Sequence, residues 1–276
     1  MDAPGGTGYS SARLRVPGPA GVPTVSKAAP TRMSPASQIV ASVVIPARNE
    51  AKNLDFLIDE IAAALSGRSF EVIVVDDGST DDTGDVVAKK RAAGIAARHI
   101  RHARSLGQSA AVRTGVLRAN GTVVVTIDGD GQNDPVNIPK MLDTLAASDA
   151  DTAMVTGQRR ARTDGGSKKL ASRFANGLRR RVLKDGTVDS GCGLRAVRRD
   201  VFLTLPFFDA WHRFLPALVI REGYKVVGID IVDRPRRFGQ SNYGILDRGL
   251  RGLPDLFGVW WLMRRFRGRA DVSEIT

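Results

Sequence analysis

From residue 39 to residue 156, the apolar residues alternate between short continuous runs and helical spacing. Continuous runs rich in β-branched residues and bounded by Gly, Pro or Asp predict strands buried on both faces. Such runs occupy residues 42–46, 70–75, 96–100, 122–127 and 151–156. Apolar side chains spaced three or four apart predict helices at 49–65, 82–91, 108–118 and 137–147. Strands and helices that alternate with short loops predict an α/β fold, a mostly parallel sheet flanked by helices.

After residue 158, basic residues accompany the apolar ones. Residues 210–222 predict another helix and 224–232 another strand. In 167–184, apolar residues four apart, with Lys and Arg on the other faces, predict an amphipathic helix. Such a helix suits an anionic surface, and a core-packed helix with a solvated basic face fits the pattern equally well. In 252–266, a Trp pair before several arginines predicts a helix at a membrane interface, or one docked on the main domain or on a dimer partner.

The chain carries a net charge of +12, and the positive excess lies from residue 158 onward. This charge predicts a phosphate-rich partner such as a nucleotide, an anionic lipid or a nucleic acid. No apolar run is long enough to predict a transmembrane helix, and residues 1–38, rich in Pro, Gly, Ser and Ala, predict a disordered arm. The single cysteine, Cys192, suits a reducing compartment. We therefore expect a cytoplasmic protein that is peripherally associated with the inner face of a membrane.

Acidic residues follow two of the predicted strands. Asp76 and Asp77 end the run 70–75, and Asp128 and Asp130 follow the run 122–127. The carboxyl ends of parallel strands meet at one edge of a sheet, so the four carboxylates should converge. An isolated Asp-x-Asp is more often a solvated turn, but its place at the end of a buried strand favours a site for a hard divalent cation with phosphate oxygens.

Several other kinds of active site are excluded because their motifs are missing. The sequence has no G-x-x-x-x-G-K-[ST] phosphate loop, and no G-x-G-x-x-G opens the first helix. The three histidines and one cysteine lack zinc-ligand spacing, and no G-x-S-x-G elbow is present. Converging acids with a basic half-chain nearby are the layout expected for a site that handles a nucleoside diphosphate.

Three motifs carry a family resemblance: VVIPARNE at 43–50, VVDDGSTD at 74–81 and DGDGQ at 128–132. In this order and spacing they resemble the inverting, GT-A-type family 2 glycosyltransferases. Further matches are GQSAA at 107–111, GQR at 157–159, DSGCGLR at 189–195 and PRRFGQSNYG at 235–244. With these the chain resembles the polyprenyl-phosphate branch, which includes dolichyl-phosphate mannose synthase and undecaprenyl-phosphate sugar transferases. The resemblance implies a GT-A-like domain at 39–244, after the arm at 1–38 and before an amphipathic membrane-surface or docking segment at 245–276.

The resemblance also implies roles for individual residues. The nucleotide of a UDP- or GDP-linked sugar would lie against Pro46, Ala47, Arg48, Glu50, Asp76, Asp77, Gly107 and Asp128. Mg²⁺ or Mn²⁺ would be held by Asp128, Asp130 and Gln132, where it neutralises charge on the leaving diphosphate. The acceptor phosphate would meet Arg159, Arg173, Arg237 and Ser241. Of these residues, Asp130, Arg159 and Arg237 are the expected catalytic ones, although a solvated face accounts for Arg173 equally well.

A polyprenyl phosphate as acceptor agrees with the absence of an obvious carboxylate base near residues 189–199. The phosphate is already ionised at pH 7 and needs only positioning, whereas a sugar hydroxyl needs a general base. Asp200 could be that base, but we expect it to cap a helix before Val201. Transfer to a sugar or glycolipid hydroxyl and a non-catalytic basic module for nucleic acid or anionic lipid are the alternatives. Because no transmembrane helix is predicted, the C-terminal segment or a partner subunit would provide the membrane anchor.

Overall fold

The computed structural model describes residues 39–159, 177, 179–187, 189, 191–238 and 245–268, with only the backbone for 245–251. All of them belong to one contact unit, Pro35–Thr276. The domain boundary expected at residue 244 stays a prediction. Arg173 and Ser241, and most of the basic helix expected at 167–184, lie outside the described residues.

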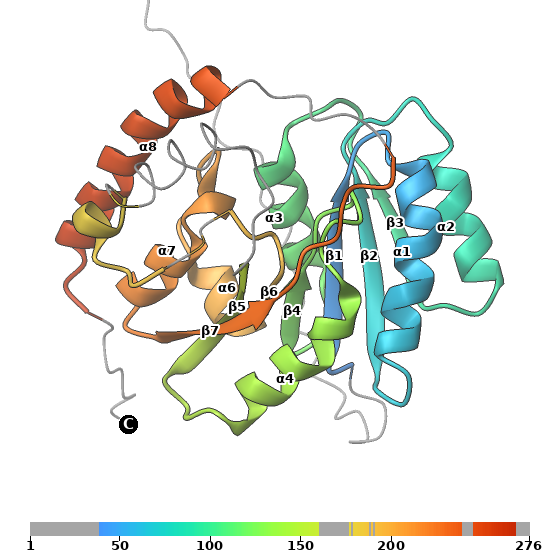
Figure 1. Ribbon diagram of the computed structural model, residues 1–276, viewed down its shortest axis with the longest axis horizontal. Coiled ribbons are helices and arrows are strands. Elements are labelled where there is room, and N and C mark those ends of the chain that lie inside the picture. The colour runs from blue at the N-terminus through green and yellow to red at the C-terminus, as the bar shows by residue number, and fades with distance from the viewer. Residues whose placement is uncertain are drawn as a thin grey trace, which may run out of the picture. The chain divides into compact units, whose positions relative to one another are not determined.

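Seven strands form a single sheet in the order β3-β2-β1-β4-β6-β5-β7 (Figure 1). They are β1 (Ala41–Ala47), β2 (Phe70–Asp76), β3 (Ala97–Arg101), β4 (Val123–Thr126), β5 (Thr152–Arg159), β6 (Arg195–Arg198) and β7 (Lys225–Ile231). Every pair of neighbouring strands is parallel except β4–β6 and β5–β6. The predicted mostly parallel α/β sheet is confirmed, and the antiparallel strand β6 was not predicted.

Helices cover both faces of this sheet. On one face lie α1 (Ala51–Ala64), α2 (Thr83–Ala92) and α4 (Ile138–Ala147), and on the other lie α3 (Gln108–Arg118), α6 (Arg199–Thr204), α7 (Leu215–Arg221) and α8 (Ile245–Arg265). Successive side chains of β1 alternate between the two cores, because Val43 and Ile45 pack on the first face and Val44 packs on the second. The carboxyl ends of β1, β2 and β4 therefore share one edge of a sheet that is buried on both sides.

Three predicted helices differ from the structure in their limits. The helix expected at 210–222 is divided into the 3₁₀ turn η3 (Trp211–Arg213) and α7, whose second residue is Pro216. The helix expected at 252–266 begins earlier, at Ile245, and continues through Pro254. The predicted cap at Asp200 is wrong, because α6 begins at Arg199 and its N-cap is Arg198, without a side-chain cap. Asp200 lies in the first turn, where its carboxylate accepts a hydrogen bond from the backbone N–H of Val201.

Candidate active site

The turn after β4 places two carboxylates at the edge of the sheet. Asp128 accepts a hydrogen bond of 2.8 Å from the Gln108 side-chain amide at the start of α3. Its carboxylate also lies against Gly193, where a β-carbon would stand only 2.2 Å from Oδ2. Burial, reinforced by the charge of Asp130, raises the pKa of Asp128 to about 6. The close contact and the burial therefore make the charged form of this carboxylate less favourable than that of a free aspartate.

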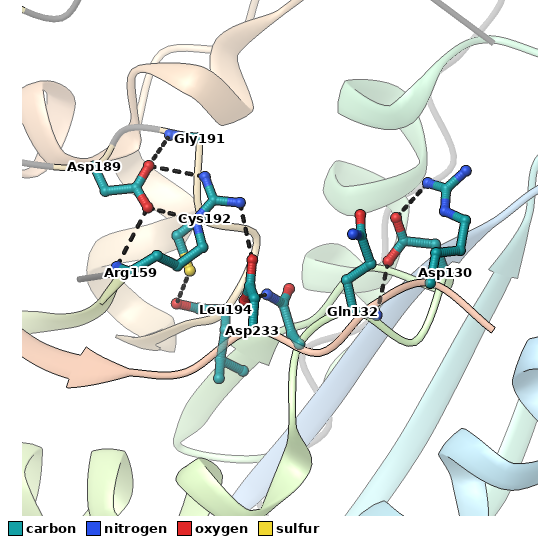
Figure 2. A network of polar contacts seen from close by, with 10 residues as sticks. Asp130, Gln132, Arg159, Asp189, Gly191, Cys192, Leu194 and Asp233 are labelled. Atoms are coloured by element: carbon teal, nitrogen blue, oxygen red, sulfur yellow. Dashed lines mark hydrogen bonds and ion pairs between the residues drawn. The ribbon is translucent and has the colours of Figure 1, made fainter. Parts of the chain in front are cut away.

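Asp130 is held from two sides (Figure 2). Its Oδ1 accepts a hydrogen bond of 3.1 Å from the backbone N–H of Gln132, across a turn that Gly131 makes with a φ of 72°. Its Oδ2 lies 2.5 Å from the guanidinium of Arg236, which comes from the segment after β7. The Asp130 carboxylate is therefore already paired with a cation that belongs to the chain itself.

The chemistry of this turn fits a hard divalent cation. Asp128 and Asp130 raise the free energy of each other's charged form, as the pKa of Asp128 shows, and a cation between them would remove that cost. Across the part of the chain that the structure describes, no group of three or more His, Cys, Asp or Glu side chains could hold a metal. The amide oxygen of Gln132 and phosphate oxygens of a substrate would have to complete the coordination shell of an ion at the two carboxylates.

The second acidic pair, at the end of β2, is more deeply enclosed. Asp77 accepts four hydrogen bonds of 2.6–2.9 Å, from His102, from Ser105 and from the backbone N–H groups of Leu106 and Gly107. Burial alone would raise the pKa of Asp77, but these donors outweigh it and the pKa is lowered. Its predicted contact with a nucleotide base stays a prediction, and it would require one of these donors to move.

Asp76 and the loop after β1 complete this edge. Asp76 accepts from the Ser79 backbone N–H at 2.7 Å and lies 3.2 Å from the His99 ring, so its pKa is lowered despite burial. Ser79 in turn accepts from the backbone N–H of Asn49, a residue with a φ of 57°. The predicted nucleotide residues of this loop are thereby fixed against the end of β2, with Arg48 exposed and Glu50 half-buried.

Gly107 and Gln108 connect the two acidic pairs. Gly107 donates its backbone N–H to Asp77, and the next residue donates its side-chain amide to Asp128. Gly107 has a φ of 88°, a conformation that glycine adopts without strain, immediately before α3 begins. The first turn of α3 is therefore the physical link between the predicted nucleotide residues and the predicted metal ligands.

Arg159, at the end of β5, is enclosed by two acids (Figure 2). Its Nε and Nη2 donate to Asp189 at 2.5 and 2.9 Å, and its Nη1 donates to Asp233 at 3.0 Å. Burial alone would lower the pKa of Arg159, but these two carboxylates raise it. In this conformation Arg159 connects the end of β5 to Asp189, which precedes β6, and to Asp233, which follows β7. Its predicted contact with an acceptor phosphate stays a prediction that requires one of these ion pairs to open.

The segment after β7, residues 232–238, crosses this edge of the sheet. It pairs with the turn after β4 through an isolated bridge between Asn133 and Asp233 and through the Arg234 backbone N–H, which donates to the Gln132 carbonyl. Arg237 lies 4.4 Å from the Phe56 ring centroid and 3.7 Å from Glu60, and its side chain is 53% exposed. Of the predicted phosphate-binding arginines, Arg237 therefore presents an accessible guanidinium.

Four residues that hold this site together were absent from the predicted set. They are Gln108, Asp189, Asp233 and Arg236. Three of the four lie inside the motifs of the family resemblance. The motifs therefore marked these residues, but they did not indicate which partner each one binds. Asp233 lies outside them and had no sequence signal.

Comparison with known protein families and proteins identifies relatives. The model of the Glycosyl transferase family 2 matches residues 42–205. The dodecaprenyl-phosphate galacturonate synthase of Rhizobium johnstonii is 35% identical over 237 residues, which are 83% of this chain and 69% of that protein. An undecaprenyl-phosphate 4-deoxy-4-formamido-L-arabinose transferase of Pectobacterium carotovorum is 37% identical over 211 residues, 74% of this chain. The chain spans 63% of the length of that second relative, less than two thirds.

Solved structures with the same fold come from Mycobacterium tuberculosis. Its glucosyl-3-phosphoglycerate synthase in complex with UDP matches with a TM-score of 0.61 at 22% identity, over 82% of this chain and 80% of that one. The same enzyme with Mn²⁺, UDP and glucosyl-3-phosphoglycerate matches with a TM-score of 0.60 at 23% identity, over 84% and 81%. At this level of identity, the likeness extends to the fold.

Proposed function

We propose that this chain, which belongs to glycosyl transferase family 2, moves a sugar with inversion from a nucleotide-diphosphate sugar to a polyprenyl phosphate. One observation carries the proposal: 35% identity, over 83% of the chain, to a protein named for dodecaprenyl phosphate and galacturonate. The acidic edge of the sheet supports a nucleotide-sugar donor, because Gln108 and the backbone of Leu106, two residues apart, bind the acids of the predicted metal and nucleotide sites.

On the donor side, Asp128, Asp130 and the amide oxygen of Gln132 would hold Mg²⁺ or Mn²⁺. When bound, such an ion supplies Lewis-acid neutralisation of the charge that develops on the leaving diphosphate. The chain's own contribution is to orient both carboxylates, through Gln108 for Asp128 and through the Gln132 backbone N–H for Asp130. Pro46, Ala47, Arg48 and Glu50 would line the nucleoside side of the same edge.

On the acceptor side, the proposal needs cations and no general base, because a phosphate monoester is already ionised at pH 7. Arg237 is the described residue best suited to meet it, since its guanidinium is half-exposed beside the segment that pairs with the metal turn. Asp200, the candidate base for a hydroxyl acceptor, lies in the first turn of α6, where its carboxylate already accepts a hydrogen bond from the Val201 backbone N–H. This arrangement supports a phosphate acceptor over a sugar hydroxyl.

The lipid would be reached through α8. No helix among the residues that the structure describes is both long and apolar enough to cross a membrane. Instead α8 exposes Leu253, Phe257 and Trp261, which lie four residues apart on one face at 53, 65 and 49% exposure. The opposite side of the helix packs through the buried Val259. Arg264, Arg265 and Arg267 follow this apolar stripe, so the surface suits the anionic inner face of a membrane.

The proposal is tested by a screen of UDP- and GDP-sugars with a short polyprenyl phosphate and Mn²⁺, with product detection by mass spectrometry. We expect one donor to give a sugar–phosphate–lipid product whose NMR spectrum shows inverted anomeric configuration. Asp130→Asn and EDTA should each abolish transfer, whereas Asp134→Asn, four residues further along the chain, should not. Full activity in EDTA would refute the metal role, and transfer only to hydroxyl acceptors would refute the phosphate acceptor.

A further inference from the structure

Two consecutive side chains of η3 bind one residue in the first turn of α3. The Trp211 indole Nε1 donates a hydrogen bond of 3.2 Å to the carbonyl of Ser109. The His212 ring Nδ1 lies 2.6 Å from the hydroxyl of the same serine. Ser109 is 1% exposed and Trp211 is 2% exposed, so these contacts are shielded from water. The backbone and the side chain of Ser109 are therefore both fixed by a segment about a hundred residues away in the sequence.

His212 is a neutral partner in this pair. Burial, together with the charges of Arg195 and Arg213, lowers the pKa of His212 to about 3. The imidazole therefore carries no charge near neutral pH and acts through hydrogen-bond geometry alone. The Ser109 hydroxyl donates to Nδ1 in one tautomer of the neutral ring and accepts from it in the other, so the 2.6 Å contact is a directional hydrogen bond in either case.

Ser109 directly follows Gln108 in the first turn of α3. Gln108 is the first residue of α3 and is exposed, so its side chain has no packing of its own to keep it in place. Its amide nevertheless donates to Asp128 at 2.8 Å. A shift of the first turn of α3 would move this donor away from the carboxylate.

We propose that Ser109 and His212 are positioning residues for the metal site, which keep Gln108 hydrogen-bonded to Asp128. The inference rests on the proposed function, because it assigns Asp128 to a metal. A hydrogen bond to a ligating carboxylate fixes the direction of its lone pairs, and loss of such an outer contact lowers metal affinity about tenfold or more. The hydrogen bond between His212 and Ser109 would thus act on the metal site through the hydrogen bond between Gln108 and Asp128.

The test measures Mn²⁺ binding to the full chain by electron paramagnetic resonance, without nucleotide. We expect Ser109→Ala and Gln108→Ala each to weaken Mn²⁺ binding about tenfold, and the double variant to weaken it no more than the stronger single one. This non-additivity is required if Ser109 acts through Gln108. His212→Phe should match Ser109→Ala, whereas His212→Asn, which keeps a polar atom near the place of Nδ1, should stay within about threefold of the parent chain.

Val116→Ala is the matched control, because Val116 is a buried residue of the same helix that packs in the second core. It should lower the melting temperature without a change in Mn²⁺ affinity. Additive losses in the Ser109 and Gln108 variants, or a destabilised Ser109→Ala protein with parental Mn²⁺ affinity, would overturn the inference alone. No Mn²⁺ binding by the parent chain, either alone or with UDP or GDP added, would overturn the metal assignment and this inference with it.

Discussion

The guanidinium of Arg236 lies 2.5 Å from Oδ2 of Asp130 and so places an internal cation on a predicted metal ligand. Arg236 reaches this position from 106 residues away, on the segment that crosses the end of β4. A divalent ion that binds Asp130 through Oδ2 has to displace this guanidinium. The segment after β7 therefore competes with the metal for Asp130.

Arg236→Gln should consequently bind Mn²⁺ more tightly than the parent chain in the absence of nucleotide. The expected gain is about tenfold, equivalent to about 1.4 kcal/mol, the scale of a partly exposed charge-assisted hydrogen bond. Isothermal titration with MnCl₂ measures it. Arg237→Gln is the matched control, because Arg237 is adjacent and contacts Phe56 and Glu60 instead of Asp130. Weaker Mn²⁺ binding by Arg236→Gln would show that Arg236 supports the site and does not compete for it.

Gly193 should tolerate no side chain. A β-carbon there would lie 2.2 Å from Oδ2 and 2.4 Å from Cγ of Asp128, so the carboxylate would have to leave its hydrogen bond with Gln108. We expect Gly193→Ala to lose most Mn²⁺-dependent transfer, by about a hundredfold if both the orientation of Asp128 and its metal contact are lost. Transfer rates across a MnCl₂ titration measure the effect.

Gly258→Ala, in α8, is the control for this glycine, because nothing lies within 4 Å of its added β-carbon. Alanine is the better helix former, so this variant should be neutral or more stable by up to about 1 kcal/mol. Parental activity in Gly193→Ala would mean that Asp128 does not need the position that it has in the structure.

The exposed stripe of α8 predicts how the protein binds lipid. Phe257→Ser combined with Trp261→Ser removes two apolar side chains, each worth about 1.5–3 kcal/mol when buried in an apolar phase. We expect this variant to sediment with phosphatidylglycerol vesicles at least tenfold more weakly than the parent chain. Val136→Ser is the control, because Val136 is 68% exposed and lies in the 3₁₀ turn η2 (Pro135–Asn137). Unchanged sedimentation of the double variant would refute α8 as the lipid-binding surface.

The hydrophobic pattern predicted most of the sheet, and the exception is instructive. Strand β6 was not predicted because two of its four residues are arginines, so it shows no continuous apolar run. Arg195 is nevertheless only 4% exposed in the centre of the sheet. Likewise α8 continues through Pro254, which a helix pattern treats as a boundary. Charge and proline mask an element whenever tertiary contacts outweigh local preference.

The location of the candidate site could be predicted from the sequence, but the hydrogen bonds and ion pairs within it could not. Parallel strands with acidic ends put Asp76 and Asp128 at one edge, and this follows from sheet geometry alone. Sheet geometry does not predict which residues pair with these charged groups. Arg159 could have paired with any of several acids, and its choice of Asp233, 74 residues away, depends on how the segment after β7 crosses the sheet. Long-range pairing is a property of the folded chain.

Glu71 predicts an acid sensitivity that is independent of the active site. This carboxylate, buried in β2, accepts from the Ser42 hydroxyl at 2.7 Å, from the Arg98 guanidinium at 2.7 Å and from the Asn120 backbone N–H at 2.7 Å. Burial alone would raise the pKa of Glu71, but these donors lower it below its usual value of 4.5. Its stabilisation is therefore complete above about pH 4.5 and is lost as the pH falls through the lowered folded-state pKa.

Glu71→Gln keeps the shape of the side chain but removes its negative charge. The amide oxygen of Gln forms weaker hydrogen bonds with the three donors than the carboxylate does. We expect the substitution to lower the free energy of unfolding at pH 7 by about 1–3 kcal/mol, the cost of weakened hydrogen bonds to a buried charged group. Other carboxylates with lowered pKa values, including Asp76 and Asp77, titrate in both proteins, so the difference between parent and variant isolates Glu71. Urea unfolding from pH 7 to pH 3 should show this difference shrink as the solution becomes more acidic. A difference that stays constant over that range would mean that Glu71 contributes by packing rather than by its charge.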